Sequence, residues 1–447
     1  MKYFSIILSF ALLIVLTAIS TAQTQWTKYS VNPVMGPGPT GSWDDQNVGM
    51  PCVILVADTF HMWYDGNWDD AGIVGNGGIG HATSVDGVTW EKDTLNPVLL
   101  PTAGSWDSEL VSQATVIFDS TNALFHMWYA GAGPNPSDPT YIGHATSTDG
   151  GNWIKDDTHN PVLSPGSSGE WDDWGPYASC VILIDTTYYM WYDALEINTN
   201  YWSIGCATSA DGILWTKYDD PTTTNPPYAE SDPVLNRGIS TEWDYPDVRA
   251  ENVIFDGIKF HMFYTGGSWL PYEIGYAYSL NGINWTKDTL NNPVLQKGPA
   301  SSWDDHAVFN SSVLLSSNND SLKMWYAGVA SNGLMTSKIG YATAPADCVV
   351  SIRLLNKNLP NGYVLHQNYP NPFNPTTNIE FSIPKSEFVT LKVFNVLGEE
   401  VATLVSERLT SGTYKYDWDA SSLASGVYLY RIQAGAFQQI KKMILIK

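Results

Sequence analysis

The sequence predicts an all-β protein, a five-bladed β-propeller closed by its N-terminal strand and followed by a small immunoglobulin-like β-sandwich. Three observations support this fold class. One sequence pattern recurs along the chain as far as Pro345, and turn signals divide each recurrence into short strands. Beyond residue 362 the repeat gives way to a different alternation of strands and turns.

The first residues are typical of a secretory signal peptide. Lys2 precedes an apolar stretch from Phe4 to Ala18, and the small residues Ser20 and Ala22 stand before Gln23. We therefore expect residues 1–22 to be removed, with an uncleaved anchor as the alternative. No later segment has the roughly 18 apolar residues that a membrane-spanning helix needs, so we expect no transmembrane span in the mature chain.

Composition limits the classes of partner. The chain has 22 Lys and Arg against 45 Asp and Glu, a formal net charge of -23, which repels nucleic acid and anionic membranes. No nucleic-acid partner is expected, and we expect a monomer. The 19 Trp and 25 Tyr suit stacking against sugar rings, although packing within the repeats explains most of them. The four cysteines, Cys52, Cys180, Cys206 and Cys348, match no disulfide framework, and Cys52 and Cys180 occupy equivalent repeat positions as small buried side chains.

The repeat fixes the architecture of residues 23–345. The pattern GIGHATSVDGVTW, Gly78 to Trp90, returns at Tyr141–Trp153, Ser203–Trp215, Glu273–Trp285 and, truncated, Lys338–Pro345. A Trp-Asp pair precedes each copy, at Trp43-Asp44, Trp106-Asp107, Trp171-Asp172, Trp243-Asp244 and Trp303-Asp304. Within the first unit the predicted strands are Pro51–Val56, Phe60–Asp65, Gly78–Ser84 and Thr89–Lys92. Tight turns such as Asp86-Gly87 favour antiparallel sheets over a parallel solenoid.

Ring closure is predicted from the two ends of the repeat. The fifth unit stops after its third strand at Ala342, without a fourth strand. The missing pattern stands at the N-terminus, where Trp26-Thr27-Lys28 and Asn32-Pro33-Val34 repeat Trp90 to Val98. We expect this segment to complete the last blade and to hide two sheet edges.

After a predicted linker, residues 346–362, residues 363–447 form the predicted sandwich. This segment resembles the type A C-terminal sorting domain of the type IX secretion system. The resemblance is carried by the run from Asn368 to Pro375 (NYPNPFNP), by Gly398 and Gly412, and by Ser425-Gly426-Val427-Tyr428. The resemblance implies export across an outer membrane by the type IX machinery and a secreted or cell-surface location. An immunoglobulin-like stalk is the alternative.

Candidate site residues are predicted on one face of the propeller. The long connections on that face carry Trp68, Trp202 and Trp269, and long loops on a rigid scaffold are where binding residues collect. A Trp-Asp pair common to all blades is interpreted as structural, its Asp capping a turn. The informative positions precede each innermost strand and differ between blades: Asp45, Gln46, Glu109, Gln113, Asp173, Trp174, Tyr177, Asp247, Arg249, Glu251, His306 and Asn310.

These positions form an acidic and aromatic ring suited to sugars. Glycoside hydrolysis needs two carboxyl groups, about 6.5–9.5 Å apart for inversion or about 5–5.5 Å for retention. We interpret Glu251 as the general acid, tuned by Arg249, and Asp45 or Asp173 as the base. Substrate-binding roles are predicted for Glu109, Trp174, Tyr177, Asp247, Arg249, His306, Asn310 and the three loop tryptophans. For each carboxylate the alternative is a solvated rim residue.

The marks NPVL, Trp-Asp and SxDGxxW of the five-blade ring resemble the glycosidase superfamily of families 43, 32 and 130. That resemblance implies a hydrolase acting on polysaccharide or oligosaccharide and a first-blade catalytic Asp in an Asp-Pro setting, where this chain has Gly49-Met50-Pro51-Cys52. His306 is similar to the central metal-associated His of some arabinanases, which implies Ca²⁺ at most; no other cofactor is expected. Two further hypotheses stay open, a non-catalytic carbohydrate- or protein-binding propeller and an adhesive scaffold.

Overall fold

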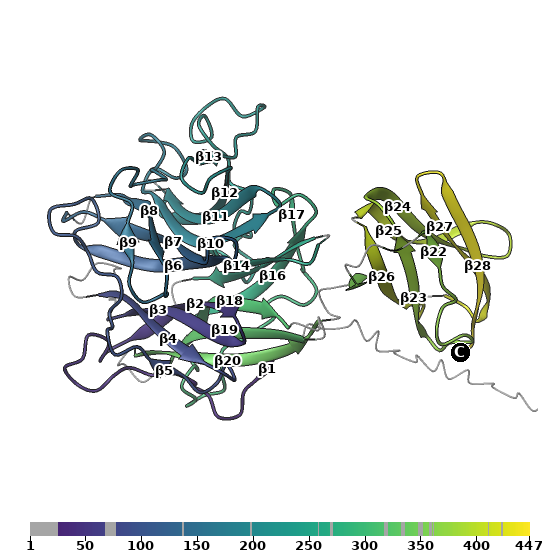
Figure 1. Ribbon diagram of the computed structural model, residues 1–447, viewed down its shortest axis with the longest axis horizontal. Helices are drawn as coiled ribbons and strands as arrows, with labels where there is room; N and C mark the ends of the chain where they lie inside the picture. Colours follow the sequence, from purple (N-terminus) through teal and green to yellow (C-terminus); the bar gives the residue numbers. More distant parts are fainter. Residues whose placement is uncertain are drawn as a thin grey trace, which may run out of the picture.

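The computed structural model divides into two all-β parts, a ring of sheets and a smaller C-terminal part, which we call the tail (Figure 1). It describes residues 26–67, 77–135, 138–196, 199–257, 259–268, 271–316, 321–331, 336–346, 352–356, 360, 362–409, 411–421 and 423–447. The predicted signal peptide lies outside these residues.

The ring consists of five four-stranded antiparallel sheets, numbered 1 to 5 along the chain. Sheet 1 is β2 (Val48–Val56), β3 (Thr59–Gly66), β4 (Gly78–Ser84) and β5 (Glu91–Lys92). Sheet 2 is β6 (Leu110–Asp119), β7 (Leu124–Ala132), β8 (Thr140–Ser147) and β9 (Ile154–Lys155). Sheet 3 is β10 (Pro176–Ile184), β11 (Thr187–Glu196), β12 (Tyr201–Ser209) and β13 (Thr216–Lys217). Sheet 4 is β14 (Asp247–Phe255), β15 (Phe260–Gly267), β16 (Tyr272–Ser279) and β17 (Trp285–Lys287).

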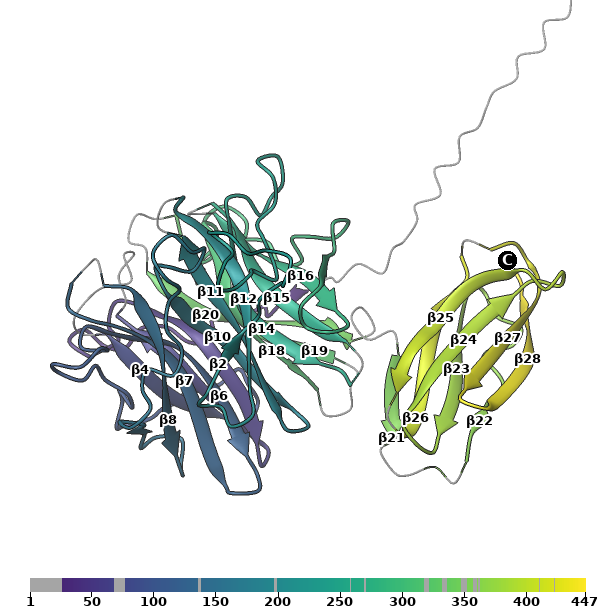
Figure 2. The same cartoon turned by 90° about the horizontal axis from the view of Figure 1, so that it is seen from above.

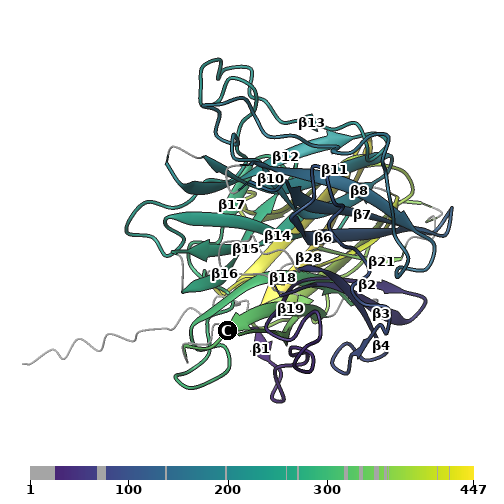
Figure 3. The same cartoon turned by 90° about the vertical axis from the view of Figure 1, so that its left-hand side faces the viewer.

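Sheet 5 is β18 (Ala307–Leu315), β19 (Ser321–Val329), β20 (Ser337–Pro345) and the N-terminal β1 (Thr27–Lys28). Thr27 pairs with Thr343 and Lys28 with Ala342, which confirms that the N-terminus supplies the missing strand. The first strands β2, β6, β10, β14 and β18 contact one another in sequence and back to β2, so the ring is closed. Figure 3 shows β6, β14 and β18 near its centre.

Every Trp-Asp pair places its Asp in a buried ion pair. In sheet 1, Lys92 Nζ lies 2.6 Å from Asp44 Oδ2, and the Tyr64 hydroxyl donates to the same oxygen at 3.2 Å. The same triad recurs as Lys155–Asp107–Tyr129, Lys217–Asp172–Tyr192, Lys287–Asp244–Tyr264 and Lys28–Asp304–Tyr326. These aspartates are structural, but the predicted capping of backbone N–H groups is wrong, because each carboxylate binds side chains of distant strands instead.

Hairpin glycines join neighbouring sheets. The Ser84 hydroxyl accepts the Gly87 N–H at 2.8 Å, and Gly87 has a φ of 80°, as the predicted turn requires. The Gly87 carbonyl then accepts two indole N–H groups, from Trp90 at 3.1 Å and from Trp325 of sheet 5 at 2.7 Å. Gly150, Gly212 and Gly282 each accept two indoles in the same way, from Trp153 and Trp63, Trp215 and Trp128, and Trp285 and Trp191.

Sheets 4 and 5 meet differently. Phe263 of sheet 4 stands where the other four sheets have the donating Trp, and the truncated fifth repeat has no hairpin glycine to receive an indole. At this joint Trp26 packs edge-on against Phe263, with ring centroids 5.6 Å apart. The hairpin Trp of each other joint also packs edge-on against the donating Trp, so Trp26 keeps the ring contact while its buried Nε1 lacks the hydrogen bond to a hairpin glycine.

Two half-buried histidine pairs are expected to lower the stability of the ring in acid. His61 Nδ1 lies 3.1 Å from His81 Nε2, and His126 Nδ1 lies 3.2 Å from His144 Nε2. Burial, followed by the neighbouring imidazole, lowers the pKa of His61 and of His144 to about 4. A folded pKa below the ordinary value of about 6.5 means that the unfolded chain binds more protons between pH 6.5 and 4, so stability falls as the pH falls through that window.

Sheet 4 offers the variant that tests this acid sensitivity. There the equivalent pair is His261 Nδ1 and the Tyr276 hydroxyl, 2.7 Å apart. We expect His81→Tyr to reduce the loss of Tm between pH 7.5 and pH 5, because one imidazole that must charge is gone. Thermal unfolding across a pH series measures this. The exposed His366→Tyr is the control, and an equal slope in the wild type and His81→Tyr would contradict the prediction.

The tail consists of two antiparallel sheets around one core. One sheet has the order β21 (Ile352–Asn356), β26 (Gly412–Asp419), β23 (Thr376–Ile383) and β22 (Val364–Leu365). The other has the order β25 (Glu400–Leu409), β24 (Glu387–Phe394), β27 (Gly426–Ala434) and β28 (Phe437–Leu445). Figure 2 shows both sheets apart from the ring. The predicted linker differs from the structure, because the alternating Ile352 and Leu354 lie in β21, which pairs with β26.

The Asn-Pro-rich motif of the tail holds its last strand. Asn371 Oδ1 accepts the Ile444 N–H at 2.9 Å, and Phe373 N–H donates to the Ile444 carbonyl at 3.0 Å. The Asn368 side chain is buried and donates to Thr377 Oγ1 at 2.9 Å. The motif therefore ties the start of the tail to its C-terminal strand.

Candidate functional site

The first strand of every sheet carries a β-bulge near the ring axis. At the same position of three sheets, Met50, Gln113 and Asn310 adopt left-handed backbone conformations, with φ of 51°, 51° and 48°. Side chains other than glycine rarely adopt this conformation, and it collects at ligand sites. The bulges turn these three residues toward the axis.

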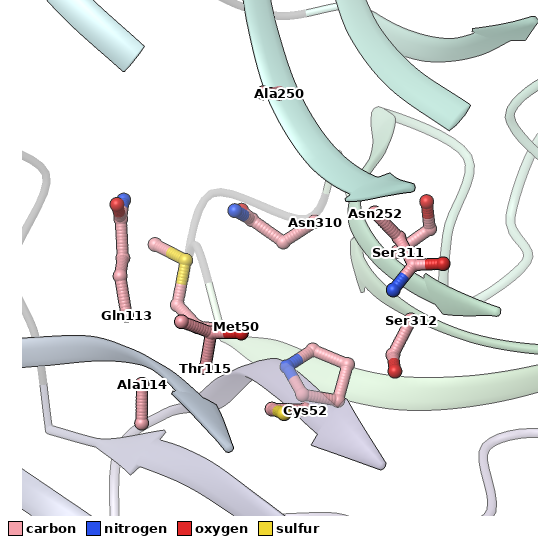
Figure 4. A pocket seen from close by; sticks show the side chains of 11 residues that line it. Met50, Cys52, Gln113, Ala114, Thr115, Ala250, Asn252, Asn310, Ser311 and Ser312 are labelled. Atoms are coloured by element: carbon pink, nitrogen blue, oxygen red, sulfur yellow. The ribbon is translucent and has the colours of Figure 1, made fainter. Parts of the chain in front are cut away.

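A cavity of about 40 Å³ lies on the axis. It is lined by Met50, Pro51, Cys52, Gln113, Ala114, Thr115, Ala250, Asn252, Asn310, Ser311 and Ser312. Figure 4 shows Met50, Gln113 and Asn310 extending into the same space. None of these lining residues is acidic, and the volume suits a few water molecules rather than a sugar ring. Among the described residues, the buried Ser311 Oγ and Asn252 Oδ1 have no hydrogen-bond partner.

Side chains next to the cavity join the first strands. Cys52 Sγ accepts the Val116 N–H at 3.2 Å, and Cys180 Sγ accepts the Val253 N–H at 3.1 Å. At the equivalent positions, Thr115 and Ser312 accept from Val181 and Val53. The two thiols are therefore hydrogen-bond acceptors rather than only small apolar groups, and burial raises the pKa of each to about 12. The three described cysteines are free, and Cys348 lies outside the described residues.

Two buried carboxyl groups that the sequence reasoning missed clamp the bulges. Both oxygens of Asp65 accept the Gln113 N–H, at 3.1 and 3.0 Å, and Asp193 Oδ1 accepts the Ala250 N–H. Burial raises the pKa of Asp65 well above its ordinary value, against the Gln113 hydrogen bond. The sequence does contain a sign of these two residues. The position after the aromatic motif of each second strand is Asp in sheets 1 and 3 but Ala or Thr in the other sheets.

Four predicted site residues come together between sheets 3 and 4. The Arg249 guanidinium lies over the Trp202 ring, 3.9 Å from its centroid, and 5.6 Å from that of Tyr272. Trp202 also contacts Tyr177, with centroids 5.2 Å apart. Asp247 accepts the Tyr272 hydroxyl at 3.2 Å and the Trp202 N–H at 3.4 Å. We call Tyr177, Trp202, Asp247, Arg249 and Tyr272 the aromatic–arginine cluster.

A local close approach positions Tyr177 in this cluster. Gly175 has a φ of 110°, and a Cβ at this residue would collide with the backbone of Thr140. Thr140 N–H also donates to the Trp174 carbonyl at 3.0 Å. Only glycine fits between Trp174 and the start of β10, so the path of the chain into Tyr177 is fixed.

Aromatic surface continues beside the cluster. The Arg237 guanidinium stacks 3.7 Å from the Tyr201 ring centroid, and the hydroxyls of Tyr201 and Tyr245 lie 3.2 Å apart. Arg237, Tyr201, Tyr245, Trp202 and Arg249 are all half-buried and so remain partly open to solvent. Flat aromatic faces beside fixed charged donors and acceptors are the groups that bind sugar rings and their hydroxyls.

Asp247 has the electrostatics of a carboxyl group held back from ionisation. Burial raises its pKa, while the nearby Arg249 opposes the shift. It is 7% exposed, so most of its hydration is lost. A carboxyl group with a raised pKa can keep a proton for transfer, which is the property required of a general acid.

The two predicted bases lie in turns. Asp45 Oδ2 accepts the Gly41 N–H at 2.7 Å, and Asn67 donates to Asp45 Oδ1 at 3.1 Å. These hydrogen bonds lower the pKa of Asp45, that of Gly41 most. Asp173 accepts the Gly169 N–H at 2.9 Å, and Asp305 closes the same turn in sheet 5. Both predicted bases therefore accept a backbone N–H and close a turn. The sequence analysis predicted this capping role for the preceding Asp of each Trp-Asp pair.

The other predicted residues are dispersed. Glu109 N–H donates to the Ala132 carbonyl and His306 N–H to the Val329 carbonyl, each where its first strand begins. Neither residue lines the axial cavity, and Asn310 does. Trp68 and Trp269 lie outside the described residues, as does the Glu251 side chain, whose backbone belongs to β14.

Metal binding is the remaining chemistry to consider at the ring axis. The axial cavity presents amide and hydroxyl groups without carboxylate or imidazole, so its residues do not fit a metal centre built on His306. Among the described residues, no three His, Cys, Asp or Glu side chains gather as a metal site.

Comparison with known proteins identifies the tail. Residues 367–447 match the family model of the secretion system C-terminal sorting domain. This match places the protein outside the cell or on its surface, by type IX export. In the described part of the chain, no helix has the length and hydropathy to cross a membrane.

Curated relatives match part of the chain. An uncharacterized protein of Mycobacterium tuberculosis is 31% identical over 188 residues, 41% of this chain and 58% of that protein. The chain thus spans little more than half the length of that relative. A blood-group A N-acetyl-α-D-galactosamine deacetylase of Flavonifractor plautii is 41% identical over 75 residues, 15% of this chain and 10% of that protein.

Solved structures share the fold of the ring. A glycosyl hydrolase from Bacteroides ovatus has a TM-score of 0.54 at 18% identity, covering 72% of this chain and 94% of its own. The β-1,2-mannobiose phosphorylase of Listeria innocua has 0.54 at 14%, covering 72% and 97%. The Flavonifractor plautii deacetylase has 0.51 at 16%, covering 70% and 96%. At these identities the likeness establishes a glycoside hydrolase-like propeller fold.

Proposed function

We propose that this chain is a secreted, glycosidase-like five-bladed propeller that binds carbohydrate on its aromatic–arginine cluster, with an immunoglobulin-like tail as its export signal. The observation that carries the proposal is the joining of Trp202, Arg249 and Asp247 between sheets 3 and 4. Trp202 stands 45 positions before Asp247, and the equivalent positions of the other repeats carry other residue types, so the repeat fold alone does not require this contact.

The chemistry of the cluster favours a sugar over other ligands. Tyr177 and Trp202 are half-buried aromatic rings, and the Arg249 guanidinium lies over one face of Trp202, so aromatic surface and a charged donor lie side by side. The negative charge of the chain disfavours polyanions, and the fold is that of carbohydrate-active proteins. The axial cavity is too small for a sugar ring, which supports binding at the aromatic–arginine cluster rather than in that cavity.

Binding is tested with glycan arrays and affinity electrophoresis on the full mature chain. We expect Trp202→Ala and Arg249→Met each to weaken the affinity for the glycan that retains the wild type at least tenfold, about 1.4 kcal/mol. The reason is the loss of an aromatic ring or of a charged donor. Tyr278→Ala, which removes a 37% exposed ring elsewhere on sheet 4, is the control. If both cluster variants are retained as strongly as the wild type, the proposal that this surface binds the glycan is wrong.

Hydrolysis is the second candidate, favoured by the raised pKa of Asp247. In this reading a carboxylic acid on β14, Asp247 or Glu251, protonates the glycosidic oxygen, and a second carboxylate activates water or attacks the sugar. A panel of chromogenic glycosides and polysaccharides is the measurement. Activity lost in Glu251→Gln or Asp247→Asn would identify the acid, whereas retention of glycans without any hydrolysis would leave a binding propeller.

A further inference from the structure

A second, larger cavity lies between sheets 1 and 2, away from the axis. Its volume is about 390 Å³, within the range of about 300–1,000 Å³ usual for small-ligand sites. We call it the rim groove. Its lining residues come from the connection after β5, the start of β7 and the β8–β9 hairpin: Leu95, Pro97, Val98, Leu124, Thr146, Ser147, Thr148, Gly151, Asn152, Trp153 and Ile154.

Two lining residues are apolar only in sheet 2. Leu124 stands where the other sheets have Thr59, Thr187, Lys259 and Ser321. Ile154 stands where they have Glu91, Thr216, Thr286 and Thr27. The repeat fold therefore does not need an apolar side chain at either position. Ile154 is nevertheless 75% exposed, and the neighbouring Leu95 is 66% exposed. Apolar surface that folding does not explain indicates contact with a ligand.

The chemistry of the groove limits the ligand. None of the described residues that line it is charged, in a chain with a net charge of -23. Leu124, Ile154 and the Trp153 indole provide apolar surface, and threonine hydroxyls and the Asn152 amide lie beside it. Trp153 is held in place, because its Nε1 donates to the Gly150 carbonyl at 2.9 Å and its ring packs edge-on against Trp63. An uncharged ligand with apolar faces and hydroxyl edges fits this lining.

Other occupants fit less well. A second copy of the chain would bring an equal negative charge toward the groove, and anionic ligands meet the same repulsion. A stable protein interface takes about 20–30 residues from each partner, whereas eleven described residues line the groove. A neutral sugar is uncharged and combines apolar ring faces with hydroxyl groups at its edges, as this lining requires.

We propose that the rim groove is a second binding site for a neutral oligosaccharide, which holds the polymer outside the aromatic–arginine cluster. The proposal rests on the carbohydrate function proposed above, but it uses different residues on different sheets. The two sites can therefore be removed one at a time.

The test replaces the sheet-2 residues by those of other sheets. Leu124→Thr with Ile154→Thr gives sheet 2 the residues that sheet 3 already accommodates, so folding is preserved and is checked by thermal unfolding. The matched control is Thr187→Leu with Thr216→Ile in sheet 3. Affinity electrophoresis of the full mature chain uses soluble mannan, arabinan, xylan and starch as probes. We expect the sheet-2 pair to weaken retention at least fivefold and the control to match the wild type.

The outcomes separate this proposal from the first one. Retention lost in Trp202→Ala but unchanged in the sheet-2 pair overturns the rim groove alone. Retention lost in the sheet-2 pair but not in Trp202→Ala supports the rim groove and overturns the cluster. A wild type that no glycan retains overturns both. If the sheet-2 pair changes only the elution volume in gel filtration, the groove is an interface between copies and the sugar proposal fails.

Discussion

Lys28→Met is expected to lower the free energy of unfolding of the ring by about 3 kcal/mol. Lys28 Nζ lies 2.6 Å from Asp304 Oδ2, whose side chain is only 3% exposed. Removing the cation leaves a buried carboxylate without its counter-ion, which costs about 3–5 kcal/mol in proteins, and we take the lower end because Lys28 is 27% exposed. Urea unfolding followed by intrinsic fluorescence measures the change.

Two further variants make the interpretation specific. Lys92→Met breaks the same ion pair in sheet 1, where the fourth strand follows its sheet directly in the chain. We expect a similar loss of stability there, but early protease cleavage near the N-terminus only in Lys28→Met, where β1 detaches. Adding Asp304→Asn to Lys28→Met should recover part of the loss, since no charge then stays unpaired. A Lys28→Met protein as stable as the wild type would show that this pair does not hold the ring closed.

Deletion of residues 367–447 is expected to abolish appearance of the protein outside the cell while leaving the ring folded. The matched sorting domain occupies this segment. Among the described residues, the tail core, which includes Phe381, Leu391 and Tyr430, contains no ring residue, and the ring cores contain no tail residue. Fractionation of cells and medium, with thermal unfolding of the retained protein, measures both parts of the prediction.

A subtler variant separates the export signal from the mere presence of the tail. Asn368 is buried, and its amide bridges Thr377 Oγ1 and the Pro370 carbonyl. Asn368→Leu removes these hydrogen bonds and should reduce export with the full chain length retained. Tyr369→Ala, at a 75% exposed neighbour, is the control for the fold of the tail. Normal export of the truncated chain would contradict the assignment.

The ring could be predicted because its information is local and repeated. Each strand and hairpin has its own sequence marks, and the match of Trp26-Thr27-Lys28 to the fourth strand was enough to predict ring closure. The tail was found from its motif, but β21 was missed because its short alternation resembles a linker.

The site was harder to predict because its contacts join residues that no motif connects. Asp193 reaches Ala250 of the next sheet, and Asp65 reaches Gln113, across 57 and 48 positions. Variation between repeats was the right criterion, but it was applied only before the first strands. It includes Tyr177, Asp247 and Arg249, which the structure brings together, but not the two aspartates near the ends of β3 and β11. Whether Asp45, Asp173 and Glu251 act in catalysis stays a prediction.

The closing strand also sets the order in which the protein can be completed. Lys28 and Asp304 are 276 positions apart, so a chain emerging from its N-terminus presents β1 long before its partner strand exists. Contacts between such distant residues form late, because the intervening chain must be ordered first. Sheets 1 to 4 each contain their own fourth strand and can assemble in turn. Sheet 5 is different, because its fourth strand comes from the N-terminus. During synthesis the ring therefore cannot close until the last repeat has been made.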